Sequence, residues 1–430
     1  MGGSRVGGSS SCRRSAALDR SPRFFKAAPA WREPALGRAT RAQLSLWPGM
    51  NKGGPASRSP SSRAALLLLG GALAMWLTQH SCTGAGSVAL DASGCPNISD
   101  MAAEAALHAL QQAAQREQAA WCAAHSDLSA GAEGYTRATA RVPGNENTTF
   151  PMWLLAQQDT VSVYIGRQGF WESGETRAFL THLATFAQAH GLQPEQTYML
   201  DIGANLGWHG LVAALMGYRV LAFEPMEGNL GALWRTLGET PALQQRYTLV
   251  PMGLSDARQR CAFFTARQNS GNGFTACGDT ANVAARDNLK VNAWGKLVKV
   301  GEFELDRLDG VLGAASRALR RRIGLIKIDV EGHEEKVIVY QGAVCFLRSA
   351  QPEFIFAEVN GPALELSAGR TTPEGMLQLY DELGYDIRRG GFGAPVQRTS
   401  SFSQLVKESQ AFRMDANFFL TQRRQARPEG

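Results

Sequence analysis

The chain has 430 residues, of which 44% are hydrophobic and 19% charged, and its formal net charge is +6 at neutral pH. The positive charge is concentrated in residues 1–63, which carry twelve Lys or Arg side chains against Asp19 and Glu33, so the rest of the chain is mildly acidic. This distribution argues against a nucleic-acid-binding protein, which needs a basic face on its folded domain.

Residues 1–63 are also rich in Gly, Ser, Ala and Pro and show little periodic apolar pattern. Such a segment cannot bury enough surface to offset the entropy lost on ordering. We therefore predict a disordered basic N-terminal region over residues 1–63.

An uncharged apolar segment, residues 64–78, follows Lys52, Arg58 and Arg63. Its fifteen residues would cover about 22 Å as a helix, against roughly 30 Å of bilayer hydrocarbon, so it suits either a signal peptide or a short membrane anchor. Because the flanking positive charge favours the cytoplasm, an uncleaved segment predicts a single-pass type II protein with its body in the Golgi or endoplasmic reticulum lumen. A chloroplast or mitochondrial transit peptide is the alternative, since the leader is rich in Arg and Ser and poor in acids.

Two glycosylation acceptor sequences follow the apolar segment, at Asn97 and Asn147, and both agree with a lumenal body. The seven cysteines include no C-x-x-C pair, so the sequence predicts neither a zinc site nor a thioredoxin-like motif. No metal is expected, and the alternative is a cation held by Asp329 and neighbouring acids.

If the body of the protein is lumenal, two disulfide pairs are the first candidates. These are Cys261 with Cys277 and Cys95 with Cys122. The alternative is that several of the cysteines are buried as small apolar side chains.

Residues 79–146 are predicted to form a stem or accessory region ahead of the main domain. Met101 to Ser126 contains neither Gly nor Pro and favours a helix, which Asp100 could cap. Residues 131–146 are expected to be a linker.

The main domain is expected over residues 147–425, where strand-like and helix-like segments alternate. After a helix at Glu175 to His190, this alternation predicts an α/β fold with a doubly wound, mostly parallel sheet. We expect strands near residues 197–202, 219–224, 247–251, 323–329, 353–359, 384–389 and 416–421. The long interval between the third and fourth must hold extra elements, with strands near 260–265 and 297–305. The Gly- and Asn-rich stretch Asn269 to Gly273 is expected to be a loop, either covering a site or forming a surface hairpin.

The stretch from Asp201 to Gly207, Asp-Ile-Gly-Ala-Asn-Leu-Gly, lies between a predicted strand and a predicted helix at Trp208 to Met216. Its glycines allow a ligand close to the backbone, and the helix start offers unpaired N–H groups. The spacing is not the G-x-G-x-x-G of dinucleotide folds, and an acid beneath the ligand would repel a pyrophosphate but suit an ammonium group. Glu224, at the end of the next strand, is placed to accept hydrogen bonds from a ribose. Together these features predict a site for S-adenosylmethionine.

A second strand, Leu325 to Asp329, also ends in acids, in the run Lys327-Ile-Asp-Val-Glu-Gly332. Together with five other segments, this run resembles the motifs of the FkbM-type methyltransferases in order and spacing. The other segments are Asp201 to Gly207, Phe223-Glu-Pro225, Gly253-Leu-Ser-Asp256, Glu304-Leu-Asp306 and Pro352 to Glu358. The resemblance spans about residues 197–420. It implies a class I methyltransferase, Rossmann-like and seven-stranded with an antiparallel last strand, that methylates hydroxyls of sugars or polyketides.

Ligands of open α/β sheets bind beyond the carboxyl ends of the strands. The residues predicted to hold the methionine part of the cofactor are Asp201, Gly203, Ala204, Asn205 and Gly207. Glu224 is predicted to hold the ribose, and the resemblance implies that Ser255 and Asp256 lie near the adenine.

A hydroxyl acceptor must lose a proton during methyl transfer, although alignment of donor and acceptor supplies most of the acceleration. The candidates for this catalytic role are Asp329, Glu331, His333 and Glu358. His333 has a pKa that ordinarily suits a general base, but a surface histidine in the first turn of a helix is the favoured interpretation.

The sequence therefore predicts an S-adenosylmethionine-dependent O-methyltransferase, anchored in the membrane, that acts on a glycan in the secretory pathway. The alternatives are a catalytically inactive binding protein with the same fold and an organellar methyltransferase for a small metabolite. No nucleic-acid partner is predicted, and the sequence does not indicate an oligomeric state.

Overall fold

The computed structural model describes residues 95, 97–124, 134–156, 159–266, 269–278, 290–291, 295–338, 342–359, 363–364, 372–411 and 416–423. The predicted disordered region and the apolar segment 64–78 lie outside these residues. Within them, no helix combines the length and the apolar character needed to cross a membrane.

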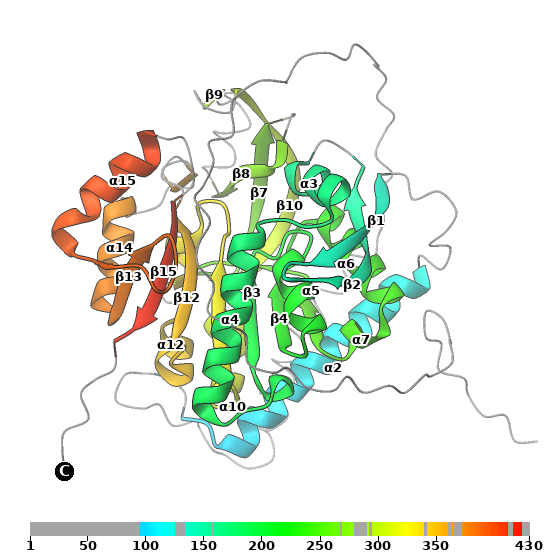
Figure 1. Ribbon diagram of the computed structural model, residues 1–430, viewed down its shortest axis with the longest axis horizontal. Helices are drawn as coiled ribbons and strands as arrows, with labels where there is room; N and C mark the ends of the chain where they lie inside the picture. Colours follow the sequence, from blue (N-terminus) through cyan, green and yellow to red (C-terminus); the bar gives the residue numbers. More distant parts are fainter. Residues whose placement is uncertain are drawn as a thin grey trace, which may run out of the picture.

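In the described part of the chain, the central element is a mixed sheet of eight strands in the order β14-β13-β15-β12-β11-β3-β4-β5 (Figure 1). In that order the strands are Val396–Gln397, Tyr385–Arg389, Ala416–Gln422, Phe354–Val359, Ile323–Ile328, Tyr198–Ile202, Arg219–Phe223 and Tyr247–Val250. Strands β12, β11, β3, β4 and β5 are parallel, and β15 is antiparallel to both its neighbours. The predicted α/β fold is confirmed, each of the seven predicted strands lies in this sheet, and β14 adds a short eighth.

Helices cover both faces of the sheet, so the central strands are buried on both sides and consist almost wholly of apolar residues. Successive residues of β3 enter opposite cores: Met199 belongs to one hydrophobic cluster and Leu200 to the other. Helices α4 (Ser173–His190), α5 (Trp208–Leu215) and α6 (Glu227–Glu239) pack in the cluster of Met199. The cluster of Leu200 includes side chains of α9 (Leu308–Leu312), α10 (Ser316–Leu319), α12 (Val344–Ala350), α14 (Pro373–Glu382) and α15 (Phe402–Ala411).

A second sheet occupies the interval between β5 and β11. Its strands are β6 (Gly253–Leu254), β10 (Gly295–Asp306), β7 (Gln259–Ala266) and β8 (Asn269–Cys277), with β9 (Lys290–Val291) paired to β10. The extra strands predicted near 260–265 and 297–305 are therefore β7 and β10. Asn269 to Gly273 do not form a loop over the site but belong to β8, which pairs antiparallel with β7, so the alternative of a hairpin is confirmed. Stacking of Phe264 on Phe274 stabilises that hairpin.

The segment ahead of the main sheet packs on the same body. Helix α2 (Asp100–Ala124) places Ala103, Leu107 and Leu110 in the core cluster of Leu200 and contacts α10 (Figure 1). Its start is capped by the Ser99 hydroxyl, which accepts from the Ala102 N–H at 3.3 Å, and not by Asp100, which pairs with Arg317 at the helix surface.

The linker predicted over residues 131–146 is wrong over most of its length. Strand β1 (Tyr135–Val142) fills it and pairs antiparallel with β2 (Asn145–Leu155). The hairpin packs on α6, where Trp153 donates its backbone N–H to the buried Thr236 hydroxyl at 2.9 Å.

Among the residues that the structure describes, two disulfides cross-link the fold. The predicted pair Cys261–Cys277 is confirmed and joins β7 to β8. The predicted pair Cys95–Cys122 is wrong, because Cys95 is bonded to Cys345 at the start of α12. Cys122 is buried near the far end of α2, about 33 Å along the helix axis from its first turn, so Cys95 cannot reach it.

Candidate functional site

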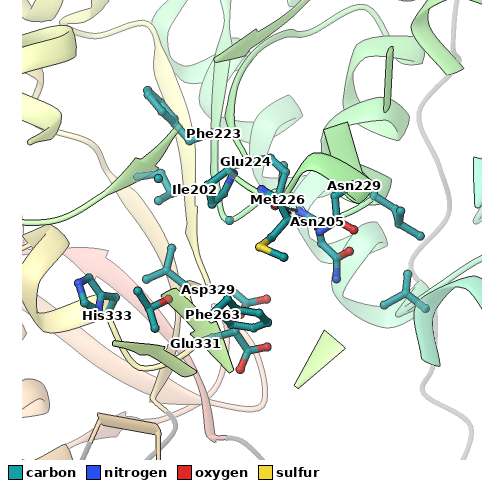
Figure 2. Close-up of a pocket in the computed structure, with 18 of the residues that line it drawn as sticks. Ile202, Asn205, Phe223, Glu224, Met226, Asn229, Phe263, Asp329, Glu331 and His333 are labelled. Atoms are coloured by element: carbon teal, nitrogen blue, oxygen red, sulfur yellow. Dashed lines mark hydrogen bonds between the residues drawn. The ribbon is translucent and has the colours of Figure 1, made fainter. Parts of the chain in front are cut away.

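A cavity of about 320 Å³ lies beyond the carboxyl ends of β3, β4 and β11, between the central sheet and the second sheet. Of the predicted site residues, the following line it: Gly203, Ala204, Asn205, Glu224, Asp329, Glu331, His333 and Glu358. Figure 2 shows Asn205, Glu224, Met226 and Asn229 around one part of the cavity, with Asp329, Glu331 and His333 around another. Asp201, Gly207, Ser255 and Asp256 are not among its lining residues.

The turn from β3 to α5 brings backbone close to the cavity. Gly203, Asn205 and Gly207 all have positive φ angles, of 79°, 52° and 77°, which Gly adopts freely and Asn tolerates. A Cβ on Gly203 would lie only 1.7 Å from the Asp329 carbonyl oxygen, so the end of β3 can meet the end of β11 only with Gly at this position. The β3–α5 turn and the residues that follow β11 therefore meet directly, and together they form the floor of the cavity.

Asp201 lies beneath this floor and is neutralised by the protein itself. Its carboxylate is 1% exposed, and Oδ1 is 3.6 Å from Nζ of Lys327, another buried side chain. The Lys327 ammonium donates to the Gly203 carbonyl at 2.8 Å and lies 3.2 Å from Asp329 Oδ2. Burial alone would lower the pKa of Lys327, but Asp329 and Asp201 raise it well above its usual value. The interpretation of Asp201 as the direct partner of a ligand ammonium is therefore wrong.

Glu224 follows β4 and is held by backbone N–H groups. Oε2 accepts from Asn205 N–H at 2.7 Å, while Oε1 accepts from Met226 N–H at 2.8 Å and from Asn229 Nδ2 at 3.2 Å. Burial raises the pKa of Glu224 to about 7, even though these hydrogen bonds favour the ionised form. The carboxyl is fixed at the cavity wall with its orientation set by the β3–α5 turn.

Ser255 and Asp256 lie behind the wall that they were predicted to line. The Ser255 hydroxyl is fully buried, donating to Asp256 Oδ1 at 3.1 Å and accepting from Gln259 Nε2 at 2.9 Å. Gly253 and Leu254 line the cavity in their place.

Asp329 directly follows β11, and Glu358 lies near the end of the neighbouring strand β12. Both residues line the cavity. Burial would raise the pKa of Asp329, but the Lys327 ammonium and a hydrogen bond with Glu358 hold it below its ordinary value. Two hydrogen-bonded carboxyl groups therefore lie beside the floor.

Beyond Asp329 the chain turns away from the strand direction. β11 ends at Ile328, and Glu331 and Gly332 have positive φ angles of 55° and 85°. The Glu331 side chain accepts from the Gly273 N–H at 3.3 Å, and its carbonyl accepts from Thr275 N–H at 3.4 Å. This loop thereby joins β8 to the floor of the cavity.

His333 precedes helix α11 (Glu334–Ile338) and is 1% exposed, so the favoured interpretation as a surface histidine is wrong. Its Nε2 lies 3.7 Å from Sγ of Cys277, next to the Cys261–Cys277 disulfide. Burial and the nearby Lys336 lower the pKa of His333 to about 3. A histidine held neutral in this way does not suit a general base near neutral pH.

The polar residues that line the cavity and that the sequence did not single out include Glu172, His209 and Lys327. Lys327 carried a usable signal, because a lysine inside the apolar strand Leu325 to Ile328 must be buried with a counter-charge. Glu172 lies in the segment before α4, outside every quoted motif, and no spacing rule connects it to the sheet edge.

The family model of the methyltransferase FkbM domain matches residues 201–387. Residues 201–387 are therefore an FkbM methyltransferase domain. The match begins at Asp201 and includes every predicted site residue, which confirms the resemblance carried by the two motifs. Among curated proteins, none matches this sequence.

Solved structures similar to this chain include three methyltransferases. Precorrin-6y C5,15-methyltransferase of Geobacter metallireducens is 12% identical, with 59% of this chain and 90% of that chain covered and a TM-score of 0.26. The O-methyltransferase of Bacillus cereus in complex with SAH is 12% identical, with 61% and 96% covered and a TM-score of 0.25. Phosphoethanolamine N-methyltransferase 2 of Haemonchus contortus in complex with S-adenosyl-L-methionine is 10% identical, with 72% and 74% covered and a TM-score of 0.28.

Proposed function

We propose that this FkbM protein is an S-adenosylmethionine-dependent O-methyltransferase that acts on a hydroxyl of a glycan in the secretory pathway. The observation that carries the proposal is that two motifs more than a hundred residues apart line one cavity. The β3–α5 turn supplies one part of its lining, and the end of β11 supplies another. The FkbM match covers both motifs.

The sheet order supports a class I methyltransferase topology. Five parallel strands are arranged β12-β11-β3-β4-β5, so the strand order reverses at β3, and the antiparallel β15 lies between β12 and β13. Ligands of doubly wound sheets bind at such a reversal point, and the cavity lies there.

The residues present fit S-adenosylmethionine. Gly203, Ala204 and Asn205 form a bare backbone cradle, since any side chain on Gly203 would collide with Asp329. Glu224 would hold the ribose hydroxyls with its fixed carboxyl. The cavity volume falls within the range of small-molecule pockets.

When bound, this cofactor supplies an electrophilic methyl group on a positively charged sulfur. The chain's own contribution is to align an acceptor with that group and to exclude water. Phe263, Phe303 and Leu305 of the second sheet form the apolar wall that excludes water. The Asp329 carboxyl, whose pKa is held below its ordinary value, lines the cavity and would accept the proton that a hydroxyl acceptor must lose.

The secretory location is supported by chemistry outside the cavity. Disulfides such as Cys95–Cys345 and Cys261–Cys277 persist in oxidising compartments and are rare in the cytosol. Asn97 and Asn147, the two glycosylation acceptors, are both exposed. An apolar anchor at residues 64–78 would hold the body in the lumen. Glycan hydroxyls are the abundant acceptors there.

The test combines cofactor binding with methyl transfer. Titration calorimetry should show that the purified full chain binds S-adenosylhomocysteine. Glu224→Ala should weaken that binding by about 10-fold or more, because a hydrogen-bond acceptor for the ribose is lost. The control is Glu227→Ala, since Glu227 is exposed at the start of α6 and does not line the cavity.

Methyl transfer is measured with S-adenosylmethionine labelled in its methyl group, offered with a panel of glycans and small hydroxyl compounds. Label in glycans would support the proposal. Cofactor binding without transfer to any member of the panel would favour the inactive alternative. Transfer to small metabolites alone, with a mature N-terminus typical of an organellar protein, would favour the organellar one.

A further inference from the structure

The neutralisation of Asp201 by Lys327 raises the question of which carboxylate meets the ammonium group of the cofactor. Asp329 also pairs with Lys327 and is hydrogen-bonded by Glu358. Glu224 is held by N–H groups through both its oxygens, and Glu331 accepts from the backbone of β8. Each of these acids thus has a partner within the protein.

Glu172 differs from them because only one of its oxygens is engaged. Oε2 lies 3.1 Å from His209 Nε2, whereas no described residue forms a hydrogen bond with Oε1. The side chain is 34% exposed and lines the cavity, while that of His209 is 6% exposed. An ionised carboxylate has about four acceptor positions, so Glu172 can accept from a ligand without releasing His209.

A buried hydrogen-bond network fixes the orientation of Glu172. The Thr176 hydroxyl donates to the Glu172 carbonyl at 2.9 Å and accepts from Trp208 Nε1 at 2.9 Å. The His209 ring lies between two groups, with Nδ1 3.1 Å from the Thr176 hydroxyl and Nε2 3.1 Å from Glu172 Oε2. The imidazole is locked, and its Nε2 is directed at Glu172.

Glu172 lies on the side of the cavity formed by the β3–α5 turn. Its partner His209 is the second residue of α5, directly after that turn. Its charge also adds to the effect of Asp329 and Asp201 on Lys327, whose ammonium contacts the Gly203 carbonyl. The backbone of Glu172 has φ 35° and ψ 58°, a left-handed conformation that is uncommon for residues other than Gly and that clusters at ligand sites.

We propose that Glu172 is the residue that binds the ammonium group of the cofactor's methionine part, with His209 as the positioning residue. The ammonium would donate to Oε1 beside the Gly203 cradle, while Oε2 stays bonded to His209. This inference rests on the proposed cofactor. It also assigns part of the cofactor site to a segment that precedes the FkbM match at residue 201.

Two ligands separate this role from general damage to the cavity. S-adenosylhomocysteine carries the amino-acid end, whereas 5′-methylthioadenosine has the same nucleoside and a thioether but no ammonium or carboxylate. Titration calorimetry of the full chain should show that Glu172→Gln weakens S-adenosylhomocysteine by about 10- to 100-fold. Binding of 5′-methylthioadenosine should stay within about 2-fold of the wild type, which also shows that the variant is folded.

The matched control is Glu175→Gln, which removes a carboxylate from the same helix start but does not line the cavity. It should leave both affinities unchanged. His209→Asn should weaken S-adenosylhomocysteine in the wild-type background but add little to Glu172→Gln, because His209 acts through Glu172. A general packing role would lower affinity in both backgrounds.

Equal affinities of the wild type and Glu172→Gln for S-adenosylhomocysteine would overturn the inference, as would an equal loss for both ligands. If the wild type binds neither ligand, the proposed cofactor itself is wrong, and the inference fails with it. The two failures are therefore distinguishable.

Discussion

The Lys327 ammonium is the central charge of the cavity floor. It is surrounded by two carboxylates and a carbonyl, on Asp201, Asp329 and Gly203, and its side chain is 5% exposed. Neither oxygen of Asp201 has a hydrogen-bond partner among the described residues, so the Lys327 charge is what compensates it. A buried pair of this kind is costly to break from one side only.

Replacing Lys327 by Met should therefore lower the free energy of unfolding by about 3–5 kcal/mol, because it leaves Asp201 charged, buried and uncompensated. Urea denaturation measures the change. The double variant Asp201→Asn with Lys327→Met should recover part of the loss. If the single variant is as stable as the wild type, Lys327 does not neutralise Asp201.

Glu224 predicts a pH dependence. Its pKa in the folded protein is about 7, above the ordinary value of 4.5, so between these values the folded state binds more protons than the unfolded state. Its contribution to stability is complete below about pH 4.5 and is lost as the pH rises through about 7, with a slope of at most about 1.4 kcal/mol per pH unit.

The measurement is the free energy of unfolding from pH 4.5 to 8 for the wild type and Glu224→Gln. Glu334 has a pKa raised to about 7 by its burial and titrates in the same window, so the difference between the two proteins isolates Glu224. Parallel pH curves would contradict the assignment.

The strand-end rule predicted the part of the site that depends on sheet geometry. Gly203, Glu224, Asp329 and Glu358 follow or end neighbouring strands, and all four line the cavity. Glu172 was missed, because its place depends on how α4 packs against α5 and not on any strand.

At the scale of elements, the close contact between β3 and β11 depends on glycine at position 203, which has no side chain. The end of β3 approaches the Asp329 carbonyl through Gly203, which also has a positive φ. The chain then leaves β5 at Val250 and pairs β6 with β10 in the second sheet. This change of sheet carries Ser255 behind the cavity wall, which a prediction based on one sheet could not foresee.

Gly203→Ala should lower the free energy of unfolding by about 2–4 kcal/mol, from the backbone collision and the unfavourable φ together. Gly174→Ala is the matched control, because Gly174 lies in α4 with open space around its Cα. That variant should be neutral or stabilising by up to about 1 kcal/mol. Chemical denaturation of both variants gives the comparison, and a fully stable Gly203→Ala would show that the floor is not tightly packed.

At the scale of the molecule, the Cys95–Cys345 disulfide joins residues 250 positions apart. The sequence predicted the right helix and the wrong partner, although the length of α2 already excluded a bond between its two ends. The partner lies in α12, whose position becomes known only when the whole fold is assembled.

Replacing Cys95 and Cys345 by Ser should lower the free energy of unfolding by roughly 4–5 kcal/mol, because a very long loop is released in the unfolded chain. The double replacement of Cys261 and Cys277, which are 16 positions apart, should cost less, about 3 kcal/mol. Thermal or chemical unfolding compares them. The order of the two effects is the decisive result, and the reverse order would contradict the loop-entropy account.

The place of β15 has a consequence for biosynthesis. Residues 416–422 are inserted between β12 and β13, two strands that have no direct pairing with each other. While a nascent chain is still attached to the ribosome and these residues are inside the exit tunnel, β12 has an unpaired edge and β13 has no place in the sheet. The sheet therefore closes only after β15 has been translated and has left the exit tunnel, and until then the exposed edge of β12 is open to chaperones or to mispairing.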